Sequence, residues 1–86
     1  MKNDSIKSVS IESGYIDLAV NEFRATREQY RAARERDNAF AERCEFSSAE
    51  AMRARESRIA FQNRLFGIKT TLYFLGIIDS EEYCAD

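Results

Sequence analysis

The first half of the chain carries a regular series of mostly apolar or small positions three and four residues apart. These positions are Ile16, Ala19, Phe23, Thr26, Tyr30, Ala33, Asp37, Phe40 and Cys44. Because helical residues at this spacing lie on one side, the series predicts a long helix over about residues 14–44, opened by Ser13 or Gly14. Residues 1–12 have too few apolar side chains to anchor them and are predicted to be a mobile N-terminal tail.

The stretch CEFSSAEAM, residues 44–52, interrupts this pattern. Ser47 followed by Glu50 matches a capping box, in which the serine hydroxyl accepts a hydrogen bond from the first turn of a new helix. A second helix is therefore predicted over about residues 48–78. Asp79 with Glu82 resembles another helix cap, which predicts a short helical turn over residues 80–84.

The second predicted helix carries two apolar stripes. The first stripe, spaced by seven residues, consists of Met52, Ile59, Phe66 and Tyr73. The second stripe consists of Phe61, Leu65, Ile68, Leu72 and Leu75. We expect the first stripe to face the first helix, because a turn at 45–47 places small residues there opposite large ones, such as Ala33 opposite Ile59. The same register places Asp37 opposite Arg55.

The second stripe then needs another cover, which a second copy of the chain, the chain's own ends or a foreign partner could supply. Burying an apolar side chain of this size is worth roughly 1.5–3 kcal/mol, so leaving five in water forfeits on the order of 10 kcal/mol, comparable to a small domain's whole stability. A chain of 86 residues also buries too little surface for a robust core. We therefore predict an all-α protein whose antiparallel helical hairpin, residues 13–86, pairs through this stripe into a homodimeric four-helix bundle.

One continuous coiled-coil helix is the alternative fold, because the heptad pattern also runs through the interruption. It places Leu65 and Leu72 in the seam, but it also places Asp37, Ser47 and Arg58 there. It leaves the first stripe of the second helix exposed. The hairpin is the preferred prediction for these reasons.

The arginines gather in the middle of the chain. All ten lie between Arg24 and Arg64, where seven acidic residues leave a net charge of +3, whereas the rest of the chain carries −5. Guanidinium groups grip carboxylates and phosphates well, so we predict that some of these side chains bind a partner. The candidates are Arg24, Arg27, Arg31, Arg34, Arg53 and Arg58. The alternative is a solvated face in which these arginines pair with neighbouring glutamates of their own helix.

The composition argues against enzymatic chemistry. The chain has no histidine, which removes histidine general bases and histidine metal ligands. Cys44 and Cys84 match no zinc spacing, lie too far apart along a helix for a disulfide, and the three glycines form no phosphate loop. We predict no enzyme activity, no catalytic residue, no cofactor and no metal.

The apolar run LFGIKTTLYFLGII, residues 65–78, is too short for a membrane span. At 1.5 Å per residue it covers about 21 Å of a hydrocarbon core of about 30 Å, and it contains Lys69. The N-terminus lacks the apolar core of a signal peptide. Two cysteines without a secretion signal indicate a reducing environment, so a cytoplasmic location is expected.

These features together predict a small non-enzymatic helical protein that binds another protein and regulates or inhibits it. In size, acidity and absence of catalytic residues the chain resembles the small inhibitors of phages and mobile elements, anti-CRISPR proteins among them. This resemblance is one of composition and implies no particular target. The alternatives are a nucleic-acid-binding helical dimer that uses the arginine-rich half, against which its pI of about 5.2 argues, and a purely structural assembly subunit.

Overall fold

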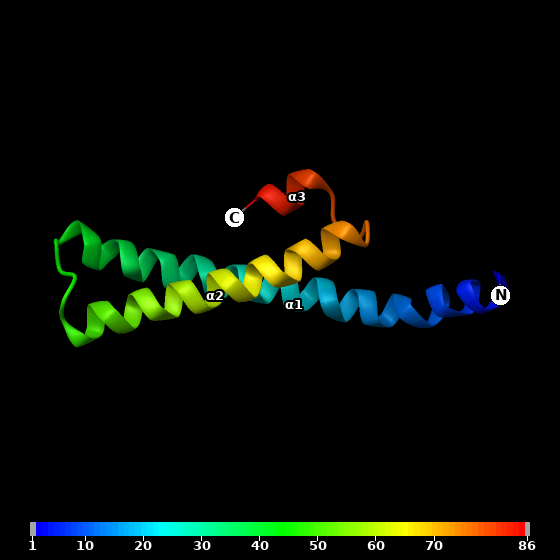
Figure 1. The fold of residues 1–86 in the computed structure, drawn as a ribbon, viewed down its shortest axis with the longest axis horizontal. Coiled ribbons are helices and arrows are strands. Elements are labelled where there is room, and N and C mark those ends of the chain that lie inside the picture. The colour runs from blue at the N-terminus through cyan, green and yellow to red at the C-terminus, as the bar shows by residue number, and fades with distance from the viewer. Residues whose placement is uncertain (1, 86) are drawn as a thin grey trace.

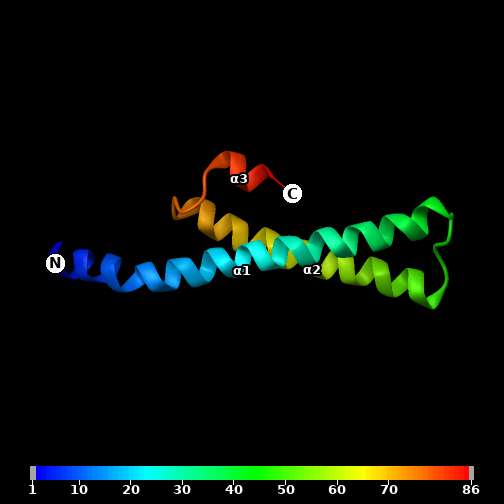
Figure 2. The ribbon, with the colours of Figure 1, turned by 180° about the vertical axis from the view of Figure 1, so that it is seen from behind.

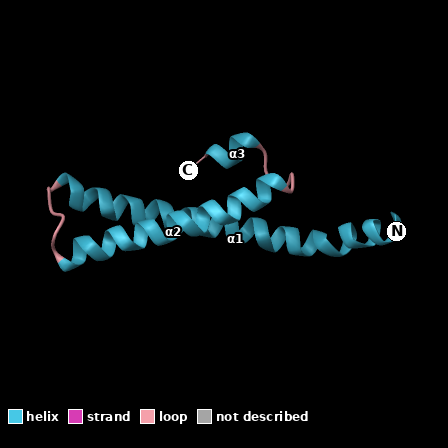
Figure 3. Ribbon diagram, viewed as in Figure 1, coloured by secondary structure: helices cyan, strands magenta, loops and turns pink. Residues whose placement is uncertain are grey.

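A computed structural model shows two long antiparallel helices and a short third helix (Figure 1). The structure describes the backbone of residues 2–85 and the side chains of residues 14–85. Helix α1 spans Lys2–Glu42, α2 spans Ala49–Phe74 and α3 spans Ser80–Cys84. Only loops join these helices in the described part of the chain (Figure 3). The predicted all-α hairpin is confirmed, and the continuous-helix alternative is wrong because the chain reverses direction between α1 and α2.

Helix α1 begins earlier than predicted. It starts at Lys2 instead of residue 14, so the predicted tail, residues 2–12, is helical, and this end of α1 extends beyond the end of α2 (Figures 1 and 2). No proline interrupts this segment, and Gly14 inside a helix costs only about 1 kcal/mol relative to alanine. The mobility expected of residues 1–12 stays a prediction.

The end of α1 is closed by a Schellman motif, in which backbone N–H groups beyond the helix return to its last carbonyls. The amide of Cys44 donates to the Ala41 carbonyl at 2.9 Å, and that of Glu45 donates to the Phe40 carbonyl at 3.0 Å. Cys44 has a φ of 55°, a left-handed conformation that this motif usually assigns to glycine. Helix α1 therefore ends at a cysteine in a conformation that glycine adopts with less strain.

The start of α2 lies one residue later than the predicted capping box. Ser48 is the N-cap, and its hydroxyl accepts from the Ala51 amide at 3.1 Å. The same hydroxyl donates to Oε2 of Glu45 at 2.7 Å, which holds it in place. The predicted cap at Ser47 is wrong, because only Ser48 is positioned by this carboxylate.

The end of α2 comes at Phe74, four residues before the predicted end at residue 78. Gly76 has a φ of 74°, and the amides of Gly76 and Ile77 donate to the carbonyls of Tyr73 and Leu72 in a second Schellman motif. Beyond it, Oδ1 of Asp79 accepts from the Glu82 amide at 2.8 Å and caps α3. The predicted cap at Asp79 and the short turn over residues 80–84 are confirmed.

The core of the hairpin uses the apolar stripe of α2 that was assigned to an external partner. Leu65 and Leu72 are 2% and 3% exposed. They cluster with Phe23 and Tyr30 of α1 and with Ile78, and Phe61 and Ile68 pack around this cluster. Nearer the turn the contact is made by small residues, Ala33, Ala51 and Ala54, which are all buried.

The prediction that the first stripe faces α1 is wrong. Met52, Ile59, Phe66 and Tyr73 are between 40% and 57% exposed. The register also differs, because Asp37 pairs with Arg58, one turn along from the predicted Arg55. The second stripe is a wider apolar arc than the single file of the first, so turning that arc toward α1 removes more apolar surface from water.

Candidate interaction surfaces

The arginines of α1 at positions 27, 31 and 34 already contact groups of their own chain. Arg27 Nη1 lies 2.7 Å from Oε2 of Glu82 on α3, and Arg31 Nη1 lies 3.1 Å from Oε1 of Glu28. The Arg34 guanidinium stacks 5.2 Å above the centre of the Tyr30 ring. Two of these three guanidinium groups are therefore engaged by carboxylates of the same chain.

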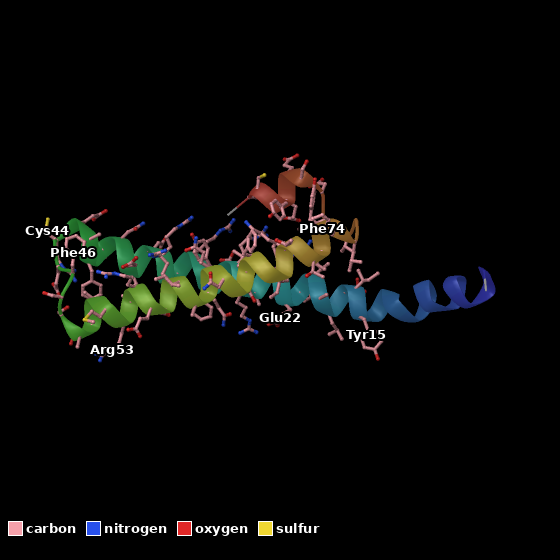
Figure 4. The ribbon with its side chains drawn as sticks, viewed as in Figure 1. Tyr15, Glu22, Cys44, Phe46, Arg53 and Phe74 are labelled. Carbon is pink, nitrogen blue, oxygen red and sulfur yellow. The ribbon has the colours of Figure 1, made fainter. Side chains whose placement is uncertain are left out.

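The remaining predicted arginines are not all on this side of the hairpin. Arg58 donates to Asp37 and to Gln62 Oε1, and Gln62 lines a shallow hollow beside Tyr30. Arg53 instead lines a different hollow, and near the turn it points outward from α2 (Figure 4). Arg24 is exposed and makes no ion pair within the described part of the chain. The structure thus brings positions 27, 31, 34 and 58 near one side and leaves Arg53 apart.

The exposed side of α2 presents the apolar stripe Met52, Ile59, Phe66 and Tyr73, here called the outer stripe. Its twenty-one-residue span corresponds to about 32 Å of helix. Sequence reasoning assigned these residues to the core and missed them as a surface. The available signal was their single-file spacing of seven, because the other stripe has neighbours three and four residues apart and forms a broader face.

A second apolar surface lies where the two helices separate, at the end opposite the turn. Tyr15 and Ala19 of α1, Thr71 and Leu72 of α2, and Leu75 just beyond the end of α2 line a groove of about 540 Å³, here called the open-end groove. A neighbouring hollow shares Ala19, Thr71 and Leu72 with it. The small side chain of Ala19 leaves this space between the helices.

The five residues predicted as a dimer interface are split by the structure. Leu65 and Leu72 lie in the core of the protomer, and Phe61 and Ile68 are half-buried against that core. Leu75 is 68% exposed and lines the open-end groove. Of the predicted interface, Leu75 therefore offers the most surface to a second molecule. Sequence reasoning missed Tyr15 and Leu18, which are exposed to a similar degree on α1.

The turn of the hairpin displays an aromatic ring and a thiol. Phe46 is exposed in the loop, and Cys44 lies beside it at the tip (Figure 4). The carbonyl of Phe46 accepts from Arg55 Nη2 at 3.3 Å. Cys44 and Cys84 are both exposed free thiols. Phe46 is therefore displayed at the turn and not tucked under the hairpin.

Neither metal-binding nor membrane-spanning geometry is found among the described residues. No three acidic, cysteine or histidine side chains of this part come together as a metal site would require. None of its helices combines the length and the apolar character that crossing a bilayer demands. Comparison with protein-family models, curated proteins and solved structures finds no match to this chain.

Proposed function

We propose that this protein is a non-enzymatic interaction module that binds another protein through α2 and regulates or inhibits it. The observation that carries the proposal is the outer stripe: four large apolar side chains remain 40–57% exposed in a folded hairpin whose core is made by other residues. The four side chains recur along one face of α2 at intervals of about 10 Å, the spacing at which the apolar seam positions of a second helix recur. A protein that acts by binding alone regulates its target by covering part of the target's surface.

The exposed area is large enough to matter for affinity. Full burial of such a side chain is worth roughly 1.5–3 kcal/mol, and about half of each of the four remains to be buried. Covering the outer stripe therefore contributes on the order of 4 kcal/mol, or about a thousandfold in affinity. The residues of the outer stripe are spaced by seven along one helix, and the apolar positions of an amphipathic helix recur at the same spacing. We therefore propose that the partner segment is helical.

The arginines support protein binding better than the nucleic-acid alternative. Arg27, Arg31 and Arg58 are paired with Glu82, Glu28 and Asp37, and these carboxylates offset the positive field that phosphates need. We propose Arg53, the neighbour of Met52 on α2, as a polar contact at the edge of the outer stripe. Binding to nucleic acid that falls steeply between 50 and 200 mM salt, on the order of a thousandfold or more, would favour the alternative.

We further propose that the protein forms a homodimer through the open-end groove. Tyr15 and Leu75 line this groove and are 67% and 68% exposed, so a twofold axis through the groove would bring these side chains of two copies together. Tyr15→Glu with Leu75→Glu should give a monomer by sedimentation velocity, with the helical circular dichroism (CD) signal retained. A dimer that persists in this variant contradicts this interface, and a wild-type monomer contradicts the dimer.

Affinity purification from the source cell, followed by mass spectrometry, tests the proposed function. Wild-type protein is compared with Met52→Glu/Ile59→Glu in the outer stripe and with Gln29→Glu, an exposed control position on α1. Wild type and control should recover the same protein, and the stripe variant should lose it while keeping its helical CD signal. Equal recovery by the stripe variant refutes the proposal. Recovery lost only on charge reversal at Arg31, Arg34 and Arg53 would assign the contact to the arginines instead.

A further inference from the structure

The chain turns back after α2, so that α3 lies alongside the hairpin (Figures 1 and 2). Side chains of α3 contact both long helices. Glu82 pairs with Arg27 of α1. Tyr83 packs on α2: its ring centre lies 5.0 Å from that of Tyr73 and 4.9 Å from Nζ of Lys69, and its hydroxyl lies 3.4 Å from Thr70 Oγ1. The carboxylate of Glu82 and the ring of Tyr83 therefore make these contacts of α3 with the two long helices.

These contacts hold α3 only weakly. None of its side chains is buried, and a helix of five residues has little stability of its own. The residue that anchors the returning chain is Ile78, which lies before α3 and packs into the core. Gly76, with its positive φ, lies just upstream in the connection. In α3, Tyr83 is half-buried against the edge of this core, so displacing α3 uncovers that edge while Ile78 holds the preceding segment in place.

Arg27 is only partly used by its own chain. Its Nη1 contacts Glu82, whereas its Nε is buried without a hydrogen-bond partner in the described structure. Its side chain is 15% exposed and its guanidinium stacks 5.0 Å above the Phe23 ring, which holds it in place. A guanidinium binds a carboxylate best through two parallel N–H groups. The single contact from Glu82 leaves this mode of binding unrealised.

We propose that α3 is a displaceable cover over a binding site for an acidic, aromatic segment of a partner protein. Arg27 binds the carboxylate of that segment, and Lys69, Thr70 and Tyr73 receive its aromatic ring. The choice of occupant follows from charge: the cover carries Asp79, Glu81 and Glu82, and the surface beneath it carries Arg27 and Lys69. This inference identifies the class of ligand that the proposed interaction protein binds. It depends on the proposed function only in assuming that the partner is a protein.

The test uses the full chain and a fluorescein-labelled peptide of residues 79–86 with serine in place of Cys84. Wild type is compared with Glu82→Gln/Tyr83→Ala, a variant in which α3 lacks the carboxylate that pairs with Arg27 and the ring that packs on Tyr73. Fluorescence polarisation should show the peptide binding the variant at least about tenfold more tightly, because its site is open. Equal affinity for the two proteins overturns the proposal.

Arg27→Gln added to the open variant should abolish binding, and Arg36→Gln, at an exposed arginine of the same helix nearer the turn, should leave it unchanged. Retained binding without Arg27 refutes the site. If Arg27→Gln unfolds the chain, a peptide altered at the positions of Glu82 and Tyr83 replaces it and should fail to bind.

Hydrogen exchange gives an independent readout: peptide added to wild type should accelerate exchange of the Tyr83 amide, which donates to the Asp79 carbonyl in α3. A wild-type dimer that dissociates on Glu82→Gln would show instead that copies exchange their α3 helices. Tyr73 belongs both to the outer stripe and to this site, whereas Met52 and Ile59 lie nearer the turn and do not contact α3 in the described structure. Met52→Glu/Ile59→Glu should therefore not affect peptide binding, so failure of this inference leaves the outer stripe proposal standing.

Discussion

Thr26 should be replaceable by valine with a gain in stability. It is fully buried in α1 between Phe23 and Tyr30 on the side that faces α2. Its Oγ1 is buried without a hydrogen-bond partner in the described structure. Valine has nearly the same shape and the same branching at Cβ, so it keeps the packing while removing the hydroxyl.

The expected gain is about 1–2 kcal/mol in the free energy of unfolding. A buried hydroxyl without a partner costs roughly 1–3 kcal/mol, and one additional buried methyl group contributes about 0.8 kcal/mol. Part of this sum is lost to the slightly larger volume of the methyl group in a tight contact. For a chain of 86 residues, each kcal/mol corresponds to about 4–8 °C in Tm.

Urea unfolding followed by CD at 222 nm measures this change, with Thr26→Ala and Thr71→Val as comparisons. Thr26→Ala should lower stability because it leaves a cavity. Thr71→Val should be close to neutral or slightly destabilising, since Thr71 is exposed and its hydroxyl donates to the Gly67 carbonyl at 3.0 Å. A Thr26→Val protein less stable than wild type would refute the reasoning, because the hydroxyl would then have a stabilising partner in the folded protein.

Three further predictions concern the hairpin itself. Leu65→Ala should lower the free energy of unfolding by about 2–5 kcal/mol and Phe66→Ala by less than about 1 kcal/mol. A larger loss for Phe66→Ala in urea titrations would show that the stripe containing Phe66 faces α1 after all. Cys44→Gly should raise stability by about 0.5–1 kcal/mol, because glycine adopts the positive φ without strain, and a lower Tm would contradict this. Ser48→Ala should cost about 1 kcal/mol while Ser47→Ala stays within about 0.5 kcal/mol, and equal losses in thermal unfolding would contradict the assigned cap.

Local signals in the sequence accounted for most of the helices. The interruption after Cys44 and the cap at Asp79 depend on residues close in sequence, so both could be predicted. The choice between Ser47 and Ser48 could not, because either hydroxyl can cap a helix and the carboxylate of Glu45 decides between them. Gly76 was a missed signal, since glycine directly after an apolar helix commonly ends it.

The candidate surfaces depended more strongly on the tertiary structure. The sequence identified both stripes of α2 and the cluster of arginines, but it assigned the wrong stripe to the core. The contact between Arg27 and Glu82 joins residues fifty-five positions apart and has no counterpart in any local pattern. Consequently, the outer stripe and the covered site beneath α3 could not be located before the helices were placed.

The sequence by itself determined that this chain is helical, that it turns after Cys44 and caps a short helix at Asp79, and which positions around each helix are apolar. Those properties depend on backbone propensities, caps and spacing within a few residues. Only the tertiary structure decided which apolar face of α2 is buried and where the C-terminal segment lies. The rotation of one helix against another depends on the total surface that all three helices remove from water together, and that sum is not contained in any single stretch of the chain.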